Sequence, residues 1–316
     1  MYAIGLENYG GPDVLHRVEL ADPQPLAGQV RVKVKAAAIN PVDVMVREGE
    51  LSALFKSLEP PFVPGMDIAG HIDALGDDVD PALGLEQGMA VVGVVDNQGG
   101  YGGYSEYVCL PAASVIPAPP GVPLAKAASF LMNALTARNA LDTLDLPAGS
   151  QLLVTGAAGA VGTFTVALAR EAGLNVVAIA SAQDEPYLRS MGVDHFVARG
   201  DDAAQRMRDM IPAGVDAVVD TAGLLERIAP AVRDDGTIIA LRFVQPTTLE
   251  RGVRLIFVNV RERVTDHASI ARLGEQVKNG LLPLRVAGEF PADQAAQAHR
   301  RFDAGGLRGR LVLTFD

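Results

Sequence analysis

The chain of 316 residues contains a single cysteine, Cys109, and this scarcity limits both its redox chemistry and its metal chemistry. One thiol excludes an internal disulfide and any cysteine-rich zinc lobe, which fits a reducing cytoplasm. Cys109 lies in the apolar run EYVCL, which predicts a buried strand thiol rather than a reactive nucleophile. We therefore expect a cytoplasmic protein without disulfides.

The chain also lacks basic clusters, an apparent membrane anchor and several familiar catalytic signatures. It has 27 Lys and Arg against 38 Asp and Glu, for a net charge of −11, so no nucleic-acid or anionic-membrane surface is expected. Residues 146–169 carry no charge, but their Pro, Gly and Ser content argues against a membrane span, and no signal peptide is visible. Without a G-x-S-x-G elbow, a Walker A loop or a paired-carboxylate setting, hydrolase and kinase chemistry have no support.

The most informative segment that is present is a glycine-rich turn, TGAAGAVG, at residues 155–162. An apolar run precedes it and an apolar helical stripe follows it, so the order is strand, tight turn, helix. Such a turn lets the backbone approach a pyrophosphate and aims the first N–H groups of the helix at it. Only the first glycine of G-x-G-x-x-G is replaced, by Ala157. We predict a dinucleotide site rather than an ordinary strand–helix junction, with cofactor contacts from Gly156, Ala158, Gly159, Ala160, Val161 and Gly162.

The end of the second strand, residues 175–180, indicates which dinucleotide binds. NAD-binding proteins place an acidic residue about 20 residues beyond the glycines, and here that place holds Ser181. A small hydroxyl leaves room for a 2′-phosphate, although Asp184 and Glu185 follow and no cation does. Arg199, after the next apolar run, is the candidate cation, and a solvated loop arginine is the alternative. We predict NADPH.

The composition and the pattern of expected strands and helices change twice along the chain. Residues 1–120 are rich in Pro, Gly and short β-branched runs, such as the alternating QVRVKVK at 29–35, which predicts an antiparallel β domain. Residues 121–260 alternate strands with helices and predict a doubly wound parallel sheet. Its six expected strands are 151–154, 175–180, 195–198, 217–221, 237–241 and 255–260. Residues 261–316 contain a helix at 270–278 and a strand at 310–314, and we expect them to return to the first domain.

Three further motifs lie in the first domain: AINPVD with REG at 38–49, PFVPGMDIAG at 61–70 and GGYSEY at 102–107. Together with the glycine turn they resemble the medium-chain dehydrogenase/reductase superfamily, in its zinc-free quinone oxidoreductase-like branch, over nearly the whole chain. The resemblance implies an α/β fold, in which a Rossmann domain is inserted into a GroES-like β domain. It also implies a homodimer through the last Rossmann strand, here from Arg254 to Val260, whose apolar run suits an otherwise exposed sheet edge.

The resemblance also allows the zinc positions of other family members to be compared with this chain. Where zinc-dependent relatives place thiolates, an imidazole or a carboxylate, this chain has Asn40, the segment Gly65-Met66-Asp67 and Met132. A thioether is a poor zinc ligand, and the five histidines show no paired spacing. We therefore expect no catalytic metal, and a structural hydrogen-bonding role for Asp67.

Without a Lewis acid, reduction of an already electron-poor acceptor is the favoured chemistry. NADPH can deliver hydride to a quinone or an α,β-unsaturated carbonyl while the protein positions the nicotinamide and stabilises the developing oxyanion. The candidate catalytic residues are Asn40, Thr136 and Tyr104. Asn40 is expected as a neutral donor or as a turn cap before Pro41, Thr136 matches a nicotinamide-contacting threonine of the family, and Tyr104 is a donor or a packing residue.

Two further groups of residues complete the predicted site. The ends of the late sheet strands are expected to meet the cofactor, unless they only fill the core, at Ala222, Leu241, Phe257 and Val258. An apolar substrate cleft, or else filling of the domain interface, is predicted from Met45, Phe62, Met66 and Met132. Met45 and Arg138 replace tyrosines of the family, so no protein general acid is assured and water can supply the second proton.

These features predict an NADPH-dependent reductase of a small, apolar, electron-poor quinone or enone. An enoyl-thioester reductase acting on acyl-CoA or a carrier-bound chain is the enzymatic alternative, but it needs cations near the cleft mouth and the arginines here are dispersed. A non-catalytic NADPH-binding protein is the alternative of another class, which the missing tyrosine at Met45 permits.

Overall fold

The computed structural model describes residues 1–55, 58–97 and 100–316, and the chain forms two compact units. Unit 1 comprises Met1–Met132, Val264–Gly280 and Leu284–Asp316, and unit 2 comprises Asn133–Arg263 and Leu281–Pro283. Unit 1 contains antiparallel strand pairs and unit 2 a mainly parallel sheet, so the predicted α/β fold is confirmed. Residues 121–132, which the sequence assigns to the second domain, belong to unit 1.

The main sheet of unit 1 has the strand order β15-β16-β3-β4-β5-β7, with β6 also paired to β3. Its strands are β3 (Gln29–Ala38), β4 (Asp67–Leu75), β5 (Ala90–Val94), β6 (Tyr107–Pro111), β7 (Val115–Pro117), β15 (Val286–Pro291) and β16 (Arg310–Thr314). The alternation in β3 buries Val30, Val32 and Val34 completely and leaves the intervening polar residues partly exposed. On one side of β3, β6 pairs with its first half and β16 with its last three residues, so residues 310–314 complete this sheet.

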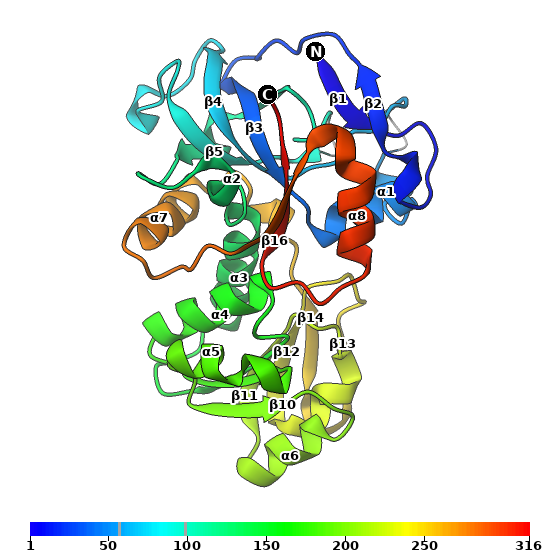
Figure 1. The fold of residues 1–316 in the computed structure, drawn as a ribbon. Coiled ribbons are helices and arrows are strands. Elements are labelled where there is room, and N and C mark those ends of the chain that lie inside the picture. Colours follow the sequence, from blue (N-terminus) through cyan, green and yellow to red (C-terminus); the bar gives the residue numbers. More distant parts are fainter. Residues whose placement is uncertain (56–57, 98–99) are drawn as a thin grey trace. The chain divides into compact units, whose positions relative to one another are not determined.

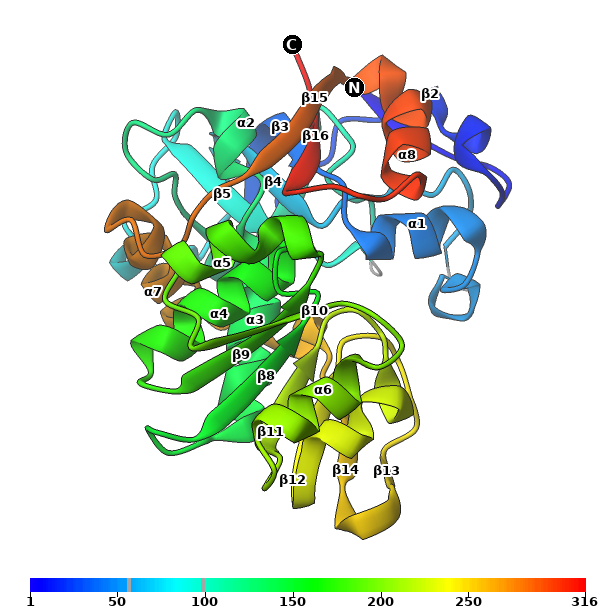
Figure 2. The same cartoon turned by 60° about the horizontal axis from the view of Figure 1, so that its bottom comes forward.

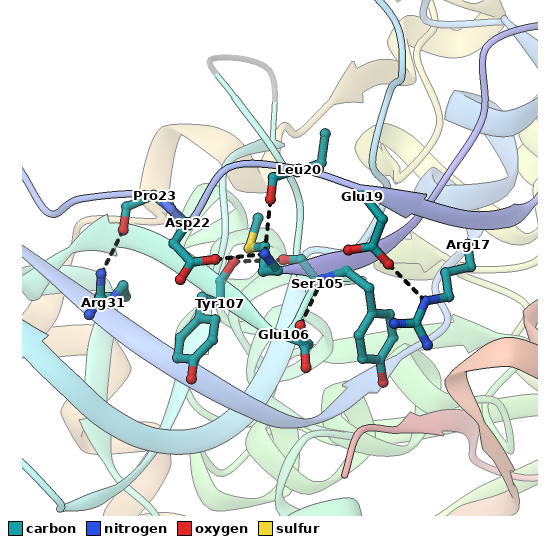
Figure 3. A network of polar contacts seen from close by, with 11 residues as sticks. Arg17, Glu19, Leu20, Asp22, Pro23, Arg31, Ser105, Glu106 and Tyr107 are labelled. Atoms are coloured by element: carbon teal, nitrogen blue, oxygen red, sulfur yellow. Dashed lines mark hydrogen bonds and ion pairs between the residues drawn. The ribbon is translucent and has the colours of Figure 1, made fainter.

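A separate two-stranded sheet is formed by β1 (Tyr2–Gly5) and β2 (His16–Glu19). Polar contacts tie it to neighbouring segments (Figure 3). The Met1 nitrogen lies 2.6 Å from the Asp22 carboxylate, and the Tyr2 N–H donates to Glu106 at 2.7 Å. The Arg17 guanidinium lies 4.1 Å from the centre of the Tyr2 ring. These contacts fix the small sheet to the segment that leads into β6.

The helices of unit 1 are α1 (Pro41–Glu48), α2 (Leu124–Ala127), α7 (His267–Lys278) and α8 (Ala295–Asp303), and α3 (Leu131–Leu144) leads from unit 1 into unit 2. Asn40 is the N-cap of α1, with proline at the first helical position, and Gly49 ends the helix with φ of 81°. Helix α8 lies beside α1 in both views (Figures 1 and 2). Residues far apart in the sequence therefore meet between these two helices.

The sheet of unit 2 has the order β10-β9-β8-β11-β12-β14-β13. Its strands are β8 (Gln151–Thr155), β9 (Asn175–Ala180), β10 (His195–Ala198), β11 (Val215–Asp220), β12 (Val232–Ala240), β13 (Thr247–Thr248) and β14 (Arg254–Phe257). The six predicted strands are parallel and follow the doubly wound order, with α4 (Ala160–Glu171), α5 (Glu185–Ser190) and α6 (Ala203–Met210) between them. Figure 2 shows α4 and α5 together on one side of this sheet and α6 away from them.

The last Rossmann strand differs from its prediction in two ways. It ends at Phe257 instead of Val260, because residues 258 and 259 leave the sheet and a short helix begins at Val260. It is also not an uncovered sheet edge, because β13 pairs with it antiparallel through Thr247 and Thr248.

None of the helices in the described part of the chain combines the length and the hydropathy that crossing a bilayer requires.

Candidate functional site

The glycine-rich turn of unit 2 joins β8 to α4 in a tightly packed arrangement. Gly156 has φ of 58°, and a Cβ atom there would lie 2.7 Å from the Thr221 hydroxyl. A Cβ atom on Gly162 would lie 2.3 Å from the Gly156 carbonyl oxygen. The close approach of strand, turn and helix therefore requires glycine at both positions, of which Gly162 is the third glycine of the fingerprint and Gly156 lies outside it.

The amides of this turn divide into used and available donors. The N–H of Ala157 donates to Ile179 O at 3.1 Å, and the N–H of Gly159 donates to Gly156 O at 2.9 Å. The N–H of Gly159 is thus used within the turn, whereas the sequence predicted that it would donate to the pyrophosphate. Ala160 and Val161 begin α4, where helix geometry provides no backbone acceptor, and no side chain caps the helix among the described residues. Ala160 and Val161 are partly exposed, and a helix end with free first-turn amides favours an anion through its N–H groups and its dipole.

A second layer of polar contacts supports the turn, and sequence reasoning missed it. Asp220, at the end of β11, is 2% exposed and accepts hydrogen bonds from the Thr155 hydroxyl at 2.5 Å and from Leu225 N–H at 2.7 Å. The Thr221 hydroxyl donates to Thr155 O at 2.7 Å. These bonds fix the end of β8 against the end of β11. The available signal was a carboxylate at the end of a strand whose other buried residues are all apolar.

The structure brings Ser181 and Arg199 to neighbouring positions. Ser181 follows β9 and Arg199 follows β10, and these two strands are paired in parallel with Ala198 opposite Ala180. The Arg199 N–H donates to Ala180 O at 2.7 Å. The Arg199 side chain is exposed and forms no ion pair within residues 1–55, 58–97 and 100–316. The residues that carry a small hydroxyl and a cation therefore follow directly after two paired strands, at their carboxyl ends.

The other strand-end predictions lie along the same edge of the sheet. Ala222 N–H donates to the Thr155 hydroxyl at 3.1 Å, and Val258 N–H donates to Ala240 O at 3.2 Å. Leu241 follows β12 directly and Phe257 is the last residue of β14. Since these strands are parallel, their carboxyl ends share an edge with the glycine turn.

Thr136 lies in the middle of α3 and is 9% exposed.

In unit 1 the structure brings Asn40, Asp67 and Met132 together. Asn40 and Asp67 are both fully buried, and the Asn40 side chain is one of the influences that oppose the rise in the pKa of Asp67. Asp67 Oδ1 accepts the N–H of Met132 at 3.1 Å. Burial raises the pKa of Asp67 to about 7, although the hydrogen bond from Met132 and the nearby Arg310 also oppose the rise. Asp67 therefore has the structural hydrogen-bonding environment expected of it, and Asn40 is a helix cap.

This donor set does not fit a zinc ion. Asn40 offers an amide, Asp67 a carboxylate already bonded to a backbone N–H, and Met66 and Met132 only thioethers. Zinc sites in proteins are built from thiolates and imidazoles with at most a minority of carboxylates. Within the described residues, no three His, Cys, Asp or Glu side chains are grouped in a way that could hold a metal.

The four residues predicted to line an apolar cleft have different surroundings. Met66 is 1% exposed and Met132 is 8% exposed, whereas Met45 and Phe62 are partly exposed. Phe62 stacks on Tyr9 with ring centres 5.4 Å apart and belongs to an aromatic cluster with Phe55. Met66 directly precedes Asp67 in the chain, and the N–H of Met132 donates to Asp67. Phe62 instead belongs to the aromatic cluster with Tyr9 and Phe55.

Tyr104 does not have the surroundings of a direct proton donor. Its side chain is completely buried, and its hydroxyl lies 3.4 Å from Asp43 Oδ2 and 3.2 Å from His299 Nε2. Burial and the Asp43 charge raise the pKa of Tyr104 well above its usual range. Asp43 and His299 were not predicted, and the one local signal was the spacing Asn-x-x-Asp, which is typical of a capping box.

Comparison with known proteins agrees with this architecture. Residues 26–120 match the alcohol dehydrogenase GroES-like domain, and residues 191–313 match the zinc-binding dehydrogenase domain. The quinone oxidoreductase of Lama guanicoe is 27% identical, over 99% of this chain and 97% of that protein. The chloroplastic NADPH-dependent alkenal/one oxidoreductase of Arabidopsis thaliana is 28% identical, over 97% of this chain and 77% of that protein.

A solved structure extends the likeness to three dimensions. A mycobacterial protein crystallised with NADPH superimposes with a TM-score of 0.87 at 27% identity, and the match covers 100% of both chains. The predicted GroES-like domain is confirmed, as is the predicted resemblance over nearly the whole sequence. The chain belongs to the medium-chain dehydrogenase/reductase superfamily, an oxidoreductase family whose members bind NAD(P).

Proposed function

We propose that this protein is an NADPH-dependent, zinc-independent reductase of quinones or α,β-unsaturated carbonyl compounds. The observation that carries the proposal is the donor set around Asn40, Asp67 and Met132, which offers an amide, a carboxylate and a thioether but no thiolate or imidazole. Such a set cannot supply the Lewis acid that alcohol oxidation requires. The acceptor must therefore be electron-poor before it binds.

The preference for NADPH is supported by the pair Ser181 and Arg199 at the ends of β9 and β10. A 2′-phosphate beside Ser181 meets no carboxylate at that position, and the exposed Arg199 guanidinium can bind it bidentately. The first-turn amides of Ala160 and Val161 would hold the pyrophosphate. Bound NADPH supplies a hydride from its nicotinamide ring, which is the chemistry this reduction needs.

In the same proposal, Asn40 provides the neutral hydrogen-bond donor of the substrate site and Thr136 contacts the cofactor. Asn40 suits this task because its place at the N-cap of α1 and the bond of its N–H to Asp43 fix its backbone, so little reorganisation is needed when charge develops on the acceptor. The thioether of Met45, which is partly exposed, favours a flat apolar acceptor, whereas Met66 and Met132 are buried. The relatives named quinone oxidoreductase and alkenal/one oxidoreductase support this substrate class.

A cofactor-oxidation screen tests the proposal. The purified protein is mixed with NADPH or NADH and with a benzoquinone, methyl vinyl ketone or crotonyl-CoA, and the loss of reduced cofactor is followed by absorbance. We expect turnover of the quinone or the enone with NADPH. Faster turnover of crotonyl-CoA would assign an enoyl-thioester reductase instead, and tight NADPH binding without turnover of any acceptor would assign a non-catalytic binding protein.

We also propose a homodimer that forms at the β13–β14 edge of unit 2. Strand β13 covers β14 only at Leu255 and Arg254, and Phe243 beside Phe257 is 66% exposed. A large exposed aromatic side chain next to a short sheet edge is typical of an interface. Light scattering should give the mass of a dimer for the wild type and of a monomer for Phe243→Glu. A wild-type monomer at micromolar concentration would refute the dimer.

A further inference from the structure

Asp43 is a buried side chain whose carboxylate holds two separate backbone segments of unit 1. Its Oδ2 atom accepts the N–H of Asn40 at 2.8 Å, and its Oδ1 atom accepts the N–H of Gly65 at 2.9 Å. Asn40 caps α1, and Gly65 lies two residues before Asp67 at the start of β4. One carboxylate therefore fixes the segment that carries Asn40 against the segment that carries Asp67.

A chain of side chains connects this carboxylate to α8. Arg47 Nη1 lies 3.2 Å from His299 Nδ1, and His299 Nε2 lies 3.2 Å from the Tyr104 hydroxyl. The same hydroxyl lies 3.4 Å from Asp43 Oδ2. An arginine can only donate, so Nδ1 of a neutral His299 accepts and Nε2 carries the proton. His299 then donates to Tyr104, and Tyr104 donates to Asp43.

Burial excludes water from these groups, and it raises the pKa of Asp43 to about 7, so this direction of donation applies to the charged form of Asp43. Asp43, Tyr104 and His299 are 0% exposed and Arg47 is 1% exposed. Burial, with a contribution from the Arg47 charge, lowers the pKa of His299 to about 3, so the ring is neutral near pH 7. Arg47 is balanced by Asp303 at 3.0 Å and by Glu48. Side chains buried this deeply cannot replace a lost hydrogen bond with one to water, so they keep the partners that the fold gives them.

We propose that His299, acting through Tyr104, is a positioning residue for Asn40: it keeps the Asp43 carboxylate turned toward the Asn40 and Gly65 amides and so couples helix α8 to the substrate site. The kinetic consequence rests on the proposed reductase function, whereas the network itself does not. Because a hydrogen bond of this kind contributes about 0.5–1.5 kcal/mol net, loss of one link should lower kcat roughly three- to tenfold.

Two substitutions of His299 separate the two contacts of its ring. In His299→Gln the side-chain amide reaches the position of Nε2 and can still donate to Tyr104. In His299→Asn the shorter side chain reaches only the position of Nδ1 and leaves the Tyr104 hydroxyl without its donor. Tyr104→Phe removes the next link and keeps the ring packing. His71→Gln and Tyr107→Phe are matched controls in the same unit, because neither side chain belongs to the network.

Two measurements are made on the full-length variants. Hydrogen–deuterium exchange reports the protection of the Asn40 and Gly65 amides, and NADPH oxidation with a benzoquinone gives kcat and KM. We expect about tenfold faster exchange at these two amides, and a lower kcat with little change in the KM for NADPH, in His299→Asn and Tyr104→Phe. His299→Gln should recover most of both losses, and the controls should match the wild type.

The outcomes separate this inference from the proposed function. Unchanged exchange at Asn40 and Gly65 would overturn the inference, as would faster exchange with unchanged kcat, since the network would then be only structural. Equal losses in His299→Gln and His299→Asn would also overturn it, because the contact with Tyr104 would not matter. A wild type that turns over no acceptor would refute the proposed function, and the exchange data would still decide whether His299 holds the two amides.

Discussion

Replacing Gly162 by alanine tests the packing on which the cofactor site depends. The new Cβ atom would lie 2.3 Å from the Gly156 carbonyl oxygen and 2.8 Å from Ala157 Cα. Ordinary contact begins at 3.4 Å, so the start of α4 must move away from the turn by an amount of order 1 Å. Overpacking of this kind costs about 1–3 kcal/mol, which corresponds to a fall in Tm of roughly 2–12 °C for a domain of this size.

The same movement displaces the amides of Ala160 and Val161 from the pyrophosphate. Loss of one charge-assisted hydrogen bond weakens binding by about 1.5–3 kcal/mol, so the Kd for NADPH should rise roughly 10- to 100-fold. Gly159→Ala separates the two effects, because its Cβ atom has one contact, at 3.1 Å to Gly156 O. We expect that variant to lose affinity for NADPH, because Gly159 is the second glycine of the fingerprint and its lack of a side chain lets the pyrophosphate approach the backbone, with a stability change below about 1 kcal/mol.

Thermal unfolding and fluorescence titration with NADPH measure both quantities. Gly11→Ala is the control, because Gly11 has φ of −68° and a Cβ atom there meets nothing within 4 Å. A Gly162→Ala protein with the Tm and Kd of the wild type would refute the packing argument. A Gly159→Ala protein that binds NADPH normally would show that the pyrophosphate does not lie against this turn.

Four other predictions concern the cofactor, two buried titratable groups and the support of the turn. Arg199→Ala should raise the Kd for NADPH about tenfold and leave that for NADH unchanged; equal effects on both would contradict the 2′-phosphate role. Burial lowers the pKa of His299 from 6.5 to about 3, so unfolding takes up a proton in this range and the free energy of unfolding falls as the pH falls. His299→Gln should therefore make the decline between pH 4 and 6 shallower by about 1.4 kcal/mol per pH unit in urea titrations. Burial raises the pKa of Asp67 from 3.8 to about 7, so the folded protein holds the extra proton in this range and Asp67 stabilises it as the pH falls. Asp67→Asn should therefore make the decline in the free energy of unfolding toward low pH steeper. For either variant, a pH dependence identical to that of the wild type would refute the assignment. Asp220→Asn should lower the free energy of unfolding by about 1–3 kcal/mol in the same assay, because Thr155 and Leu225 share its carboxylate as acceptor.

The sheet of unit 2 could be predicted because its signals are local. Each parallel strand is a short apolar run, and the turn at Gly156 and Gly162 depends on the conformation and size of glycine itself. The pairing of β9 with β10 then places Arg199 beside Ser181 without further information. The two-residue strand β13 could not be found in this way, because Thr247 and Thr248 have no apolar pattern and pair only once β14 is in place.

The network around Asp43 could not be predicted for a different reason. His299 is 195 residues from Tyr104 and 252 residues from Arg47 in the sequence. Buried polar side chains have no periodicity, and each is stable only because the tertiary structure supplies its partner. Sequence reasoning therefore named Asn40 and Tyr104 as donors but missed the groups that orient them.

The pairing of β16 with β3 also determines the order in which the two units can be completed during synthesis. Unit 2 has all seven strands of its sheet between residues 151 and 257, so they leave the ribosome one after another. The last three residues of β3 pair with β4 on one side, but they acquire their second antiparallel neighbour, β16, only when residues 310–314 have been made. The inserted unit can therefore form its sheet first, while the strand that leads to Asn40 waits for the last strand of its own sheet.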